Sequence, residues 1–595
     1  MKLQLLVILL FSLLLSSCKN EASAPNSRTD EPAEKKPNIV LIVADDQGWG
    51  DLSSTGNTNL STPNIDALAE NGVSFENFYV QPVCSPTRAE LLTGRHFPRL
   101  DVFDTSAGGE RINLGETTIA EILKKAGYST AAYGKWHSGM QPPYHPNARG
   151  FDDYYGFASG HWGNYYSPML ERNGKIVKGD GFLVDDLTTK GLEFIDKHQD
   201  SPFFVYFPYN TPHAPMQVPD EFWDRFKNKE LTLKYHGEET EDLDFTRAAL
   251  AMVENIDYNV GRIMAKLRKL YLEDDTIVIY LTDNGPNSFR FNGGMRGKKG
   301  WVDEGGVRSP FFMQWKDTLP AGKKVSQIAS VIDILPTLAN LAGADLKTEK
   351  PIDGKDLTPL LYGRDSRWGD RLIYNHWNGK TSVRSEKYRL DNEDRLYDID
   401  KDRGQTTDIS EQFQTIADSL KKAKTKWLSE VLPSNNDERP FTLGHPNYEY
   451  TQIPARDGIA HGNIKRSNKW PNDSFFTDWQ SKNDSITWNI EVLAEGTFEV
   501  ELYQTCAPEN VGCIIELSLG NSKIATKITE AHDPPLTGME NDRVLRPESY
   551  VKDFKPIKLG EMILKKGKGT MTLKALELAG EEAVDVRLLL FRRIN

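Results

Sequence analysis

The chain has 595 residues, which is too long for one ordinary domain and suggests three or four. Its composition, 38% hydrophobic and 26% charged, is that of a globular protein able to bury a large core. The formal net charge of −13 argues against a general nucleic-acid binder, which would normally be basic. Any cationic pocket for an anionic ligand must therefore be local.

The first residues are expected to be a targeting segment. Met1-Lys2 is a short basic start, and the apolar run at 3–15 is too short to span a bilayer as a helix. The run ends in the letters LSSC, which resemble the bacterial lipobox, where the peptide is cut before a cysteine that is then lipidated. We therefore expect a lipoprotein signal peptide at 1–17 and a lipid on Cys18. The alternative is an ordinary secretory signal in which Cys18 is incidental.

Residues 18–36 follow this segment and are rich in Ser, Pro, Glu and Lys without apolar periodicity. This composition predicts a disordered tether. Together the two segments predict an exported lipoprotein of a bacterial cell envelope, in the outer membrane or periplasm, that touches the membrane through its lipid only.

An α/β pattern occupies residues 37–354. Buried strands are predicted at 38–44, 202–207 and 276–281, where apolar and β-branched residues run together. Helices with clear starts lie between them, such as the one opened by the Thr118 to Glu121 capping box. Strands that alternate with helices predict a mostly parallel sheet covered on both faces.

Three further regions follow. Residues 355–432 predict a smaller α+β subdomain, with short strands at 372–374, 381–383, 388–390 and 396–398 and a helix at 416–430. Residues 433–450 carry Pro, Asn, Asp and Gly and are predicted to be a linker. Residues 451–595 change to short alternating segments separated by turns, which predict a β-sandwich. These segments are 485–491, 497–503, 513–519, 569–575 and 586–591.

Two pairs of residues in the last region have alternative interpretations. Cys506 and Cys513 flank a predicted turn, so in an exported protein they can form a disulfide across a hairpin, or remain two free thiols. A zinc site is disfavoured because no Cys/His cluster accompanies them. Trp470 and Trp479 either stack on sugar rings or belong to the sandwich core.

Acidic residues follow two of the predicted strands. Asp45 and Asp46 come after the strand at 38–44, and Asp283 and Asn284 come after the strand at 276–281. Ligands of open α/β sheets bind at the carboxyl ends of the strands. Three carboxylates there would repel one another without a cation, and an all-oxygen set suits Ca²⁺ or Mg²⁺. Each pair alone could instead be a turn or helix-cap acid.

Basic residues also stand at predicted strand ends. Lys135 and His137 follow the segment at 129, His213 follows the strand at 202–207, and Lys298-Lys299 precede the letters EGG at 304–306. Beside metal-binding acids, such residues are typical of an anion cradle with acid and base groups. A single one of them would more often be a surface residue.

The segment 82–95 reads PVCSPTRAELLTGR. It resembles the signature of the formylglycine-dependent sulfatases, in which Cys-x-Pro-x-Arg is followed by four residues and Thr-Gly. The surrounding motifs, Asp-Asp before it and Gly-Lys-Trp-His, Asp-Asn-Gly and Lys-Gly-x-x-x-Glu-Gly-Gly after it, occur in the order of that family. The resemblance covers residues 37–432 and implies an alkaline-phosphatase-like α/β fold with an α+β C-terminal subdomain.

The resemblance also implies roles for individual residues. Cys84 would be oxidised by a maturation enzyme to formylglycine, whose hydrate is the nucleophile and also a metal ligand. Asp45, Asp46, Asp283 and Asn284 match the ligands of one Ca²⁺ ion. The remaining matches are Arg88, which would hold the hydrate; Lys135 and Lys299, which would grip sulfate oxygens; His137, which would support the hydrate and help expel sulfate; and His213, which would protonate the leaving alcohol. Lys299 is preferred to Lys298 because it keeps the family's spacing to Glu304.

The reaction that the resemblance implies is the hydrolysis of sulfate monoesters. With a lipid tether and a β-sandwich that is similar to accessory domains of carbohydrate-active enzymes, the expected substrate is a sulfated carbohydrate, with ulvan, carrageenan or fucoidan ahead of glycosaminoglycans. One alternative is a phosphodiesterase or phosphonate monoester hydrolase of the same superfamily. Another is a non-catalytic binder of sulfated glycans, in which Cys84 stays a thiol.

Overall fold

The computed structural model describes residues 36–364, 368–432, 439–471 and 473–595. The predicted signal peptide, the lipidation at Cys18, nearly all of the tether and part of the predicted linker lie outside these ranges. Residues 37–595 form one compact unit. Among the described helices, we find none with the length and apolarity that crossing a membrane requires.

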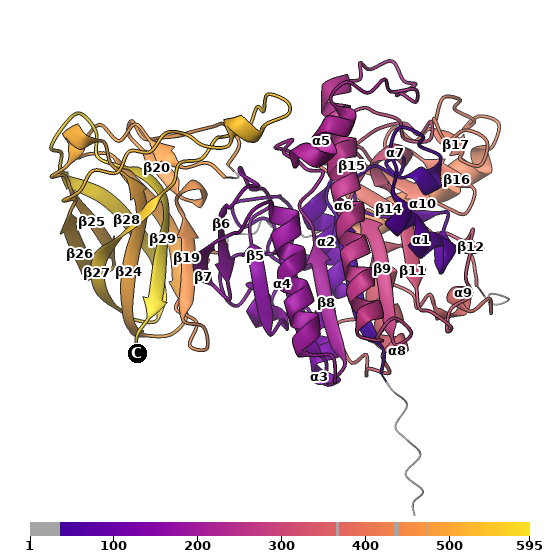
Figure 1. The fold of residues 1–595 in the computed structure, drawn as a ribbon, viewed down its shortest axis with the longest axis horizontal. Helices are drawn as coiled ribbons and strands as arrows, with labels where there is room; N and C mark the ends of the chain where they lie inside the picture. Colours follow the sequence, from indigo (N-terminus) through magenta and orange to yellow (C-terminus); the bar gives the residue numbers. More distant parts are fainter. Residues whose placement is uncertain (1–35, 365–367, 433–438, 472) are drawn as a thin grey trace, which may run out of the picture. The chain divides into compact units, whose positions relative to one another are not determined.

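The centre of the fold is a ten-stranded sheet in the order β12-β2-β11-β9-β1-β8-β4-β5-β6-β7 (Figure 1). Its middle strands, from β9 to β5, are parallel, and the strands toward both edges are mostly antiparallel. The strands are β1 Asn38–Ala44, β2 Val73–Phe75, β4 Ser129–Lys135, β5 Asp153–Phe157, β6 Met169–Arg172, β7 Lys175–Lys178, β8 Phe203–Pro208, β9 Thr276–Thr282, β11 Phe311–Gln314 and β12 Lys323–Val325.

Helices cover both faces of this sheet, as the alternation of strands and helices predicts. Alternate residues of β1 enter two different cores: Ile39 and Leu41 belong to one, and Val40 and Ile42 to the other. The second core is covered by α1 Pro63–Glu70, α4 Leu183–Lys197, α5 Asp220–Phe226 and α6 Leu243–Lys269, of which α4 and α6 face the viewer in Figure 1. The first is covered by α2 Cys84–Thr93, α3 Ile119–Lys125, α8 Ile334–Leu341 and α9 Thr358–Leu361.

The predicted strands and helix starts agree with these elements. The strand predicted at 38–44 is β1, and those predicted at 202–207 and 276–281 are β8 and β9 with one-residue shifts. The capping box that opens α3 is present, because Thr118 accepts from the Glu121 amide and Glu121 accepts from the Thr118 amide.

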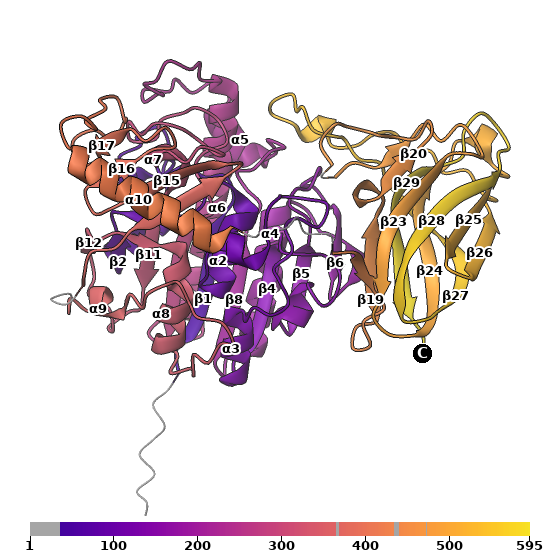
Figure 2. The same cartoon turned by 180° about the vertical axis from the view of Figure 1, so that it is seen from behind.

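The subdomain after the large sheet is a four-stranded antiparallel sheet with one helix, α10 Gln414–Val431, in front of it in Figure 2. All four strands coincide with predicted ones: β14 Ile373–Trp377, β15 Lys380–Arg384, β16 Tyr388–Leu390 and β17 Leu396–Asp398. A separate small sheet contains β3 Phe78–Tyr79, β10 Arg308–Ser309 and β13 Ala329–Ser330, all within residues 37–354, and α7 Glu304–Val307 precedes β10.

The C-terminal region consists of two six-stranded sheets around one apolar core, as a β-sandwich requires. One sheet contains β18 Phe441–Leu443, β20 Ile459–His461, β23 Ser485–Val492, β25 Ile514–Leu519, β26 Ser522–Lys527 and β28 Gly567–Glu577. The other contains β19 Tyr450–Pro454, β21 Lys465–Arg466, β22 Phe476–Thr477, β24 Gly496–Thr505, β27 Lys555–Leu564 and β29 Asp585–Arg593.

One detail of this region differs from the sequence expectations, and the structure bears on two alternatives that the sequence left open. Strand β18 lies inside the range predicted as a linker, because Leu443 is apolar and buried in the sandwich core while β18 pairs with β23. For Cys506 and Cys513 the sequence left open a disulfide or two free thiols, and the structure has the second. Both are free cysteines whose buried sulfurs pack in the same core as small apolar groups. Of the two tryptophans, Trp479 is a core residue and Trp470 is exposed.

Candidate active site at the carboxyl ends of β1 and β9

The acidic residues predicted to bind metal meet at one edge of the large sheet. Strands β1 and β9 are parallel neighbours, and Ala44 pairs in register with Thr282, so the residues that follow the two strands emerge together. The Asp46 amide donates to Asp283 Oδ1 at 3.1 Å, and Asn284 Nδ2 donates to Asp46 Oδ1 at 2.9 Å. All four residues are almost completely buried.

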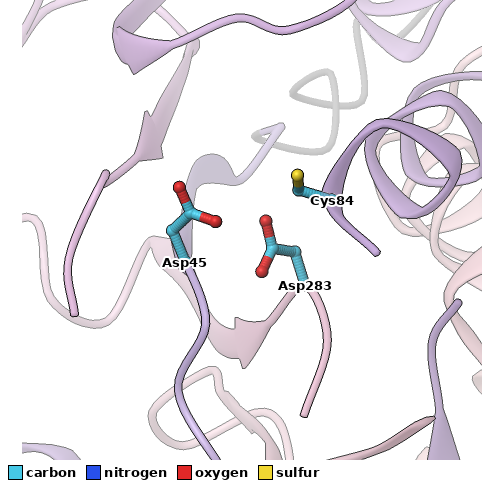
Figure 3. Close-up of side chains that lie close together, drawn as sticks. All are labelled: Asp45, Cys84 and Asp283. Atoms are coloured by element: carbon cyan, nitrogen blue, oxygen red, sulfur yellow. The ribbon is translucent and has the colours of Figure 1, made fainter. Parts of the chain in front are cut away.

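Cys84 faces these carboxylates from the first turn of α2. Its Sγ and one carboxylate oxygen each of Asp45 and Asp283 lie within 4.8 Å of one another, and Figure 3 shows the three side chains converging from two strand ends and one helix start. The amides at the start of a helix favour negative charge nearby. Burial raises the pKa of the Cys84 thiol, although Lys135 and Lys299 act in the opposite direction.

Arg88 lies one turn further along α2 and ties the helix to the acidic cluster. Its Nε and Nη2 donate to Asp283 Oδ2 at 3.1 and 2.8 Å, and its Nη1 donates to the Lys135 carbonyl at 3.0 Å. The side chain is fully buried. Helix α2 ends at Gly94, whose φ of 66° is the left-handed conformation that glycine adopts most easily.

The two predicted sulfate-binding lysines each pair with one carboxylate. Lys135, the last residue of β4, places Nζ 2.6 Å from Asp45 Oδ2. Lys299 places Nζ 2.7 Å from Asp46 Oδ1. Lys298 instead extends over the Phe289 ring, 4.8 Å from its centroid. The choice of Lys299 over Lys298 therefore agrees with the geometry.

These pairs shift the ionisation of the acids. Burial by itself would raise the pKa of Asp45, but Lys135 and His213 hold it well below its usual range. The pKa of Asp46 is likewise lowered against burial, mainly by Lys299. Burial and the neighbouring Asp45 raise the pKa of Asp283 to about 7. Of the three carboxyls, Asp283 is therefore the one whose ionised form is least favoured, although Arg88 pairs with it.

His137 is a neutral imidazole with one free nitrogen. Its Nε2 lies 2.8 Å from the Thr105 carbonyl oxygen, and a carbonyl only accepts, so Nε2 carries the proton. Burial and the nearby Lys135 lower the pKa of the ring well below its usual value. The buried Nδ1 is then an acceptor, and it has no partner among the described residues.

His213 follows β8 and faces the same cluster. Its Nε2 lies 3.6 Å from Asp46 Oδ2, and its Nδ1 lies 2.6 Å from the Ala214 carbonyl. The ring is 5.2 Å from that of His161, measured between centroids. The structure thus brings every predicted site residue of 37–354, the region that we call the catalytic half, to one edge of the sheet.

The cluster fits a divalent cation. Asp45 Oδ1 and Asn284 Oδ1 are buried oxygens without a hydrogen-bond donor in the described chain, and such atoms are costly unless something binds them. An oxygen-rich donor set is the one that Ca²⁺ and Mg²⁺ prefer. Asp45, Asp46, Asp283 and Asn284 are the residues that would hold the ion.

Sequence reasoning missed several residues around this cluster. Arg290 donates to both oxygens of Asp51 and, from Nη2 at 3.1 Å, to the Asp46 carbonyl, which fixes the turn after β1. Gly160 packs so closely on His137 that a Cβ there would lie 2.2 Å from Nε2. His161 is buried beside His213. The residues lie in loops without a regular pattern, so only their proximity in the fold reveals them.

Acids and lysines thus gather around a cysteine at the start of a helix, an arrangement that suits an anionic group held beside a cation. The sulfatase family model matches residues 37–344, and the model of the C-terminal region of N-sulphoglucosamine sulphohydrolase matches residues 297–429. The chain therefore belongs to the sulfatase family, and the protein is a sulfuric ester hydrolase.

Curated relatives and solved structures agree with this assignment. The chain is 33% identical to N-acetylgalactosamine-6-sulfatase of Mus musculus over 385 residues, covering 59% of this chain and 70% of the relative. It is 28% identical to steryl-sulfatase of Homo sapiens over 444 residues, covering 58% and 73%. The crystal structure of Ps i-CgsB in complex with k-i-k-neocarrahexaose is similar with a TM-score of 0.62 and 31% identity, covering 68% of this chain and 96% of that one.

Proposed function

We propose that this sulfatase uses formylglycine at position 84 and one Ca²⁺ ion to hydrolyse sulfate esters of carbohydrates. The observation that carries the proposal is the position of Cys84 at the start of α2, within 4.8 Å of oxygens of Asp45 and Asp283. Lys135, Arg88 and Lys299 supply positive charge around it. These local cations would attract an anionic substrate even though the formal net charge of the chain is −13.

The modification gives position 84 a group that the thiol lacks. A maturation enzyme, supplied with a two-electron oxidant, converts the Cys84 side chain to an aldehyde with loss of its sulfur as sulfide. Water then converts the aldehyde to a geminal diol. One hydroxyl oxygen bonds to the substrate sulfur as the bond between sulfur and the alcohol oxygen breaks. The second hydroxyl then loses its proton, the aldehyde C=O reforms, and the bond from the first oxygen to carbon breaks, which releases sulfate. Water hydrates the aldehyde again.

The neighbouring side chains have matching tasks. Lys135 and Lys299 would hold sulfate oxygens, where negative charge grows as the ester bond breaks. Arg88 would hold the diol beside Asp283. The Nδ1 acceptor of His137 would take the hydrogen bond, and then the proton, of a diol hydroxyl. His213 would give a proton to the leaving alcohol oxygen.

A divalent cation bound by the four oxygen ligands would supply Lewis-acid stabilisation of the sulfate and of the ionised diol. The two buried oxygens that lack donors, Asp45 Oδ1 and Asn284 Oδ1, support this placement. We name Ca²⁺ because these ligands are oxygens only and the signature resembles that of calcium-dependent sulfatases.

The substrate proposal is a sulfated carbohydrate. One relative is named for the 6-sulfate of N-acetylgalactosamine, and one similar structure holds a neocarrahexaose. Algal polysaccharides such as carrageenan, ulvan and fucoidan are therefore the first class to screen, and glycosaminoglycans the second. The N-terminal LSSC motif supports export and a lipid at Cys18, which would place the enzyme in a bacterial cell envelope.

An assay panel tests this function. Protein co-expressed with a maturation enzyme is given 4-nitrophenyl sulfate, oligosaccharides of each sulfated class, and phosphodiester and phosphonate model esters. The proposal expects hydrolysis of the sulfates, with the best kcat/KM on an oligosaccharide, and release of inorganic sulfate. A preference for phosphodiesters or phosphonates would favour the superfamily alternative. Binding of sulfated glycans without turnover of any ester would favour the non-catalytic binder.

A further inference from the structure

The connection between β26 and β27 of the β-sandwich contacts the catalytic half at the segments that carry two histidines. We call residues 537–551 the clasp. An antiparallel bridge between Thr537 and Val551 closes its base, and a second bridge joins Asp542 to Gln217 of the catalytic half. The accessory region therefore pairs directly with the chain that follows His213.

Gln217 is the centre of this contact and is fully buried. Its Nε2 donates to the Gly538 carbonyl at 2.8 Å and to Asp542 Oδ1 at 2.9 Å. Its Oε1 accepts from the Tyr165 amide at 2.8 Å. The Gln217 side chain thus joins the clasp to two segments of the catalytic half: the one that carries His213, to which Gln217 itself belongs, and the one that carries His161 and Tyr165.

Tyr165 continues the connection to His213. Its hydroxyl lies 3.0 Å from the carbonyl oxygens of both His213 and Ala214, where it donates. Tyr165 therefore fixes the backbone that orients the His213 ring. Tyr165 is in turn fixed by the hydrogen bond from its amide to Gln217. Arg543 adds to this by donating from its amide to the Met216 carbonyl at 2.9 Å.

Arg546 fixes the other segment. Its Nη1 donates to the Gly163 carbonyl, two residues after His161. Its Nε and Nη2 donate to the Asp542 carboxylate at 2.8 and 2.5 Å. The Arg546 side chain is only 1% exposed, so these hydrogen bonds are shielded from water. A buried guanidinium with a carboxylate partner and a carbonyl acceptor sets a segment's position more strictly than an exposed pair does.

We propose that the clasp is part of the active site, and that Arg546 is a positioning residue which holds the His161 segment against His213 and so orients His213 toward the leaving oxygen. The β-sandwich would then contribute to the chemical step, because its clasp sets the position of the proposed general acid. This inference rests on the proposed role of His213 as the acid that protonates the leaving alcohol.

Leaving-group dependence tests the proposal, because a misplaced general acid harms poor leaving groups most. We would measure kcat/KM of the full-length, matured enzyme on 4-nitrophenyl sulfate, whose phenol leaves easily, and on phenyl sulfate, whose phenol leaves poorly. For Arg546→Ala we expect a loss of about ten-fold on phenyl sulfate and less than about two-fold on 4-nitrophenyl sulfate. Arg546→Lys, which keeps one donor and the charge, should recover part of that loss.

Three further variants make the outcome unambiguous. Arg592→Ala removes a partly exposed arginine of β29 that pairs with Glu499 on the same sandwich, and should change neither rate. Asp542→Asn is a milder change that should give the same selectivity if Arg546→Ala does not fold. His213→Ala sets the reference, with a stronger selective loss on phenyl sulfate.

Equal losses on the two esters in Arg546→Ala, or no loss on either, would overturn the inference. A selective loss in His213→Ala without one in Arg546→Ala or Asp542→Asn would reject the clasp and leave the proposed function intact. If His213→Ala itself shows no selectivity, the acid role of His213 fails, and the inference fails with it.

Discussion

Arg88 donates from Nε and Nη2 to one oxygen of Asp283, Oδ2, at 3.1 and 2.8 Å. This pair completes a balance in which three carboxylates, Asp45, Asp46 and Asp283, face three cations, Lys135, Lys299 and Arg88. The site is near neutrality on its own residues. A bound divalent cation would make it positive by about two charges, which suits an anionic ester. The protein's lysines would then be free to turn from their carboxylates to the substrate.

Lys299 and Lys298 form a matched pair for mutation. Lys299→Ala should lower kcat/KM for sulfate esters by about 10²-fold or more, because Lys299 would bind charge that grows in the transition state. Lys298→Ala should change it by less than about three-fold, since its ammonium lies over the Phe289 ring, 4.8 Å from the centroid. The test is to measure kcat/KM of both variants and of the wild type by steady-state kinetics on 4-nitrophenyl sulfate. The reverse order would exchange the roles assigned to the two lysines.

Removal of the metal should affect both activity and stability. Treatment with a chelator should abolish turnover and lower the melting temperature, and Ca²⁺ should restore both. A ligand that binds only the folded state stabilises it by about 2.7 kcal/mol at a hundred times its dissociation constant. Asn284→Ala should weaken the calcium-dependent rise in melting temperature while the chelator-treated protein still folds. A chelator-treated enzyme with full activity would contradict the metal assignment.

Gly160 gives a steric test of His137. In Gly160→Ala the new Cβ would lie 2.2 Å from the present position of His137 Nε2, so the ring must move and its bond to the Thr105 carbonyl must break. We expect kcat to fall by about 10²-fold, a typical loss for a displaced acid–base group. Gly369→Ala is the control, because Gly369 is exposed and has no atom near the position of the new Cβ. Equal kinetics in the two variants would mean that His137 takes no part in turnover.

Glu304 links the catalytic half to the four-stranded subdomain and predicts a pH dependence of stability. Burial raises its pKa, but Arg389 and Arg308 dominate and lower it to about 2. The ordinary pKa of a Glu side chain, which applies to the unfolded chain, is 4.5. The ionised carboxylate therefore stabilises the fold fully above about pH 4.5, and this contribution disappears as the pH falls toward about 2.

The variant Glu304→Gln tests that statement. It leaves two buried arginines without a charged partner, so the free energy of unfolding at pH 7 should fall by about 3 to 5 kcal/mol. Urea denaturation between pH 7 and pH 3 should show the difference from wild type shrinking as the pH falls. A difference that stays constant with pH would show that Glu304 does not act through its charge.

Regular elements with strong local signals were predictable from the sequence. The strand ends at Asp45 and Asp283 followed from β-branched apolar runs, and α3 followed from its capping box. The sequence placed both acidic pairs at the carboxyl ends of strands, which favoured a metal site. That β1 and β9 are parallel neighbours, so that these acids meet, is known only from the structure. The motif around Cys84 added the basic residues through its resemblance to a family.

The parts that could not be predicted depend on contacts between distant segments. Nothing local to Gln217 or Arg546 indicates that the two side chains share Asp542, since they are separated by 329 positions along the chain. The sequence likewise could not decide between a disulfide and two free thiols at Cys506 and Cys513. Their spacing allows a disulfide, but burial in the sandwich core suits two thiols as well. Gly160 and His161 lie in a loop whose position is set by its neighbours.

The mass of the peptide that contains Cys84 tests the central claim most directly. The protein is made together with a maturation enzyme, digested, and analysed by mass spectrometry beside a control sulfatase. The proposed mechanism predicts a residue about 18 Da lighter than cysteine, the difference between a CH₂SH and a CHO side chain. A Cys84 that remains a thiol under conditions that convert the control would contradict the mechanism, because the site would then lack its nucleophile.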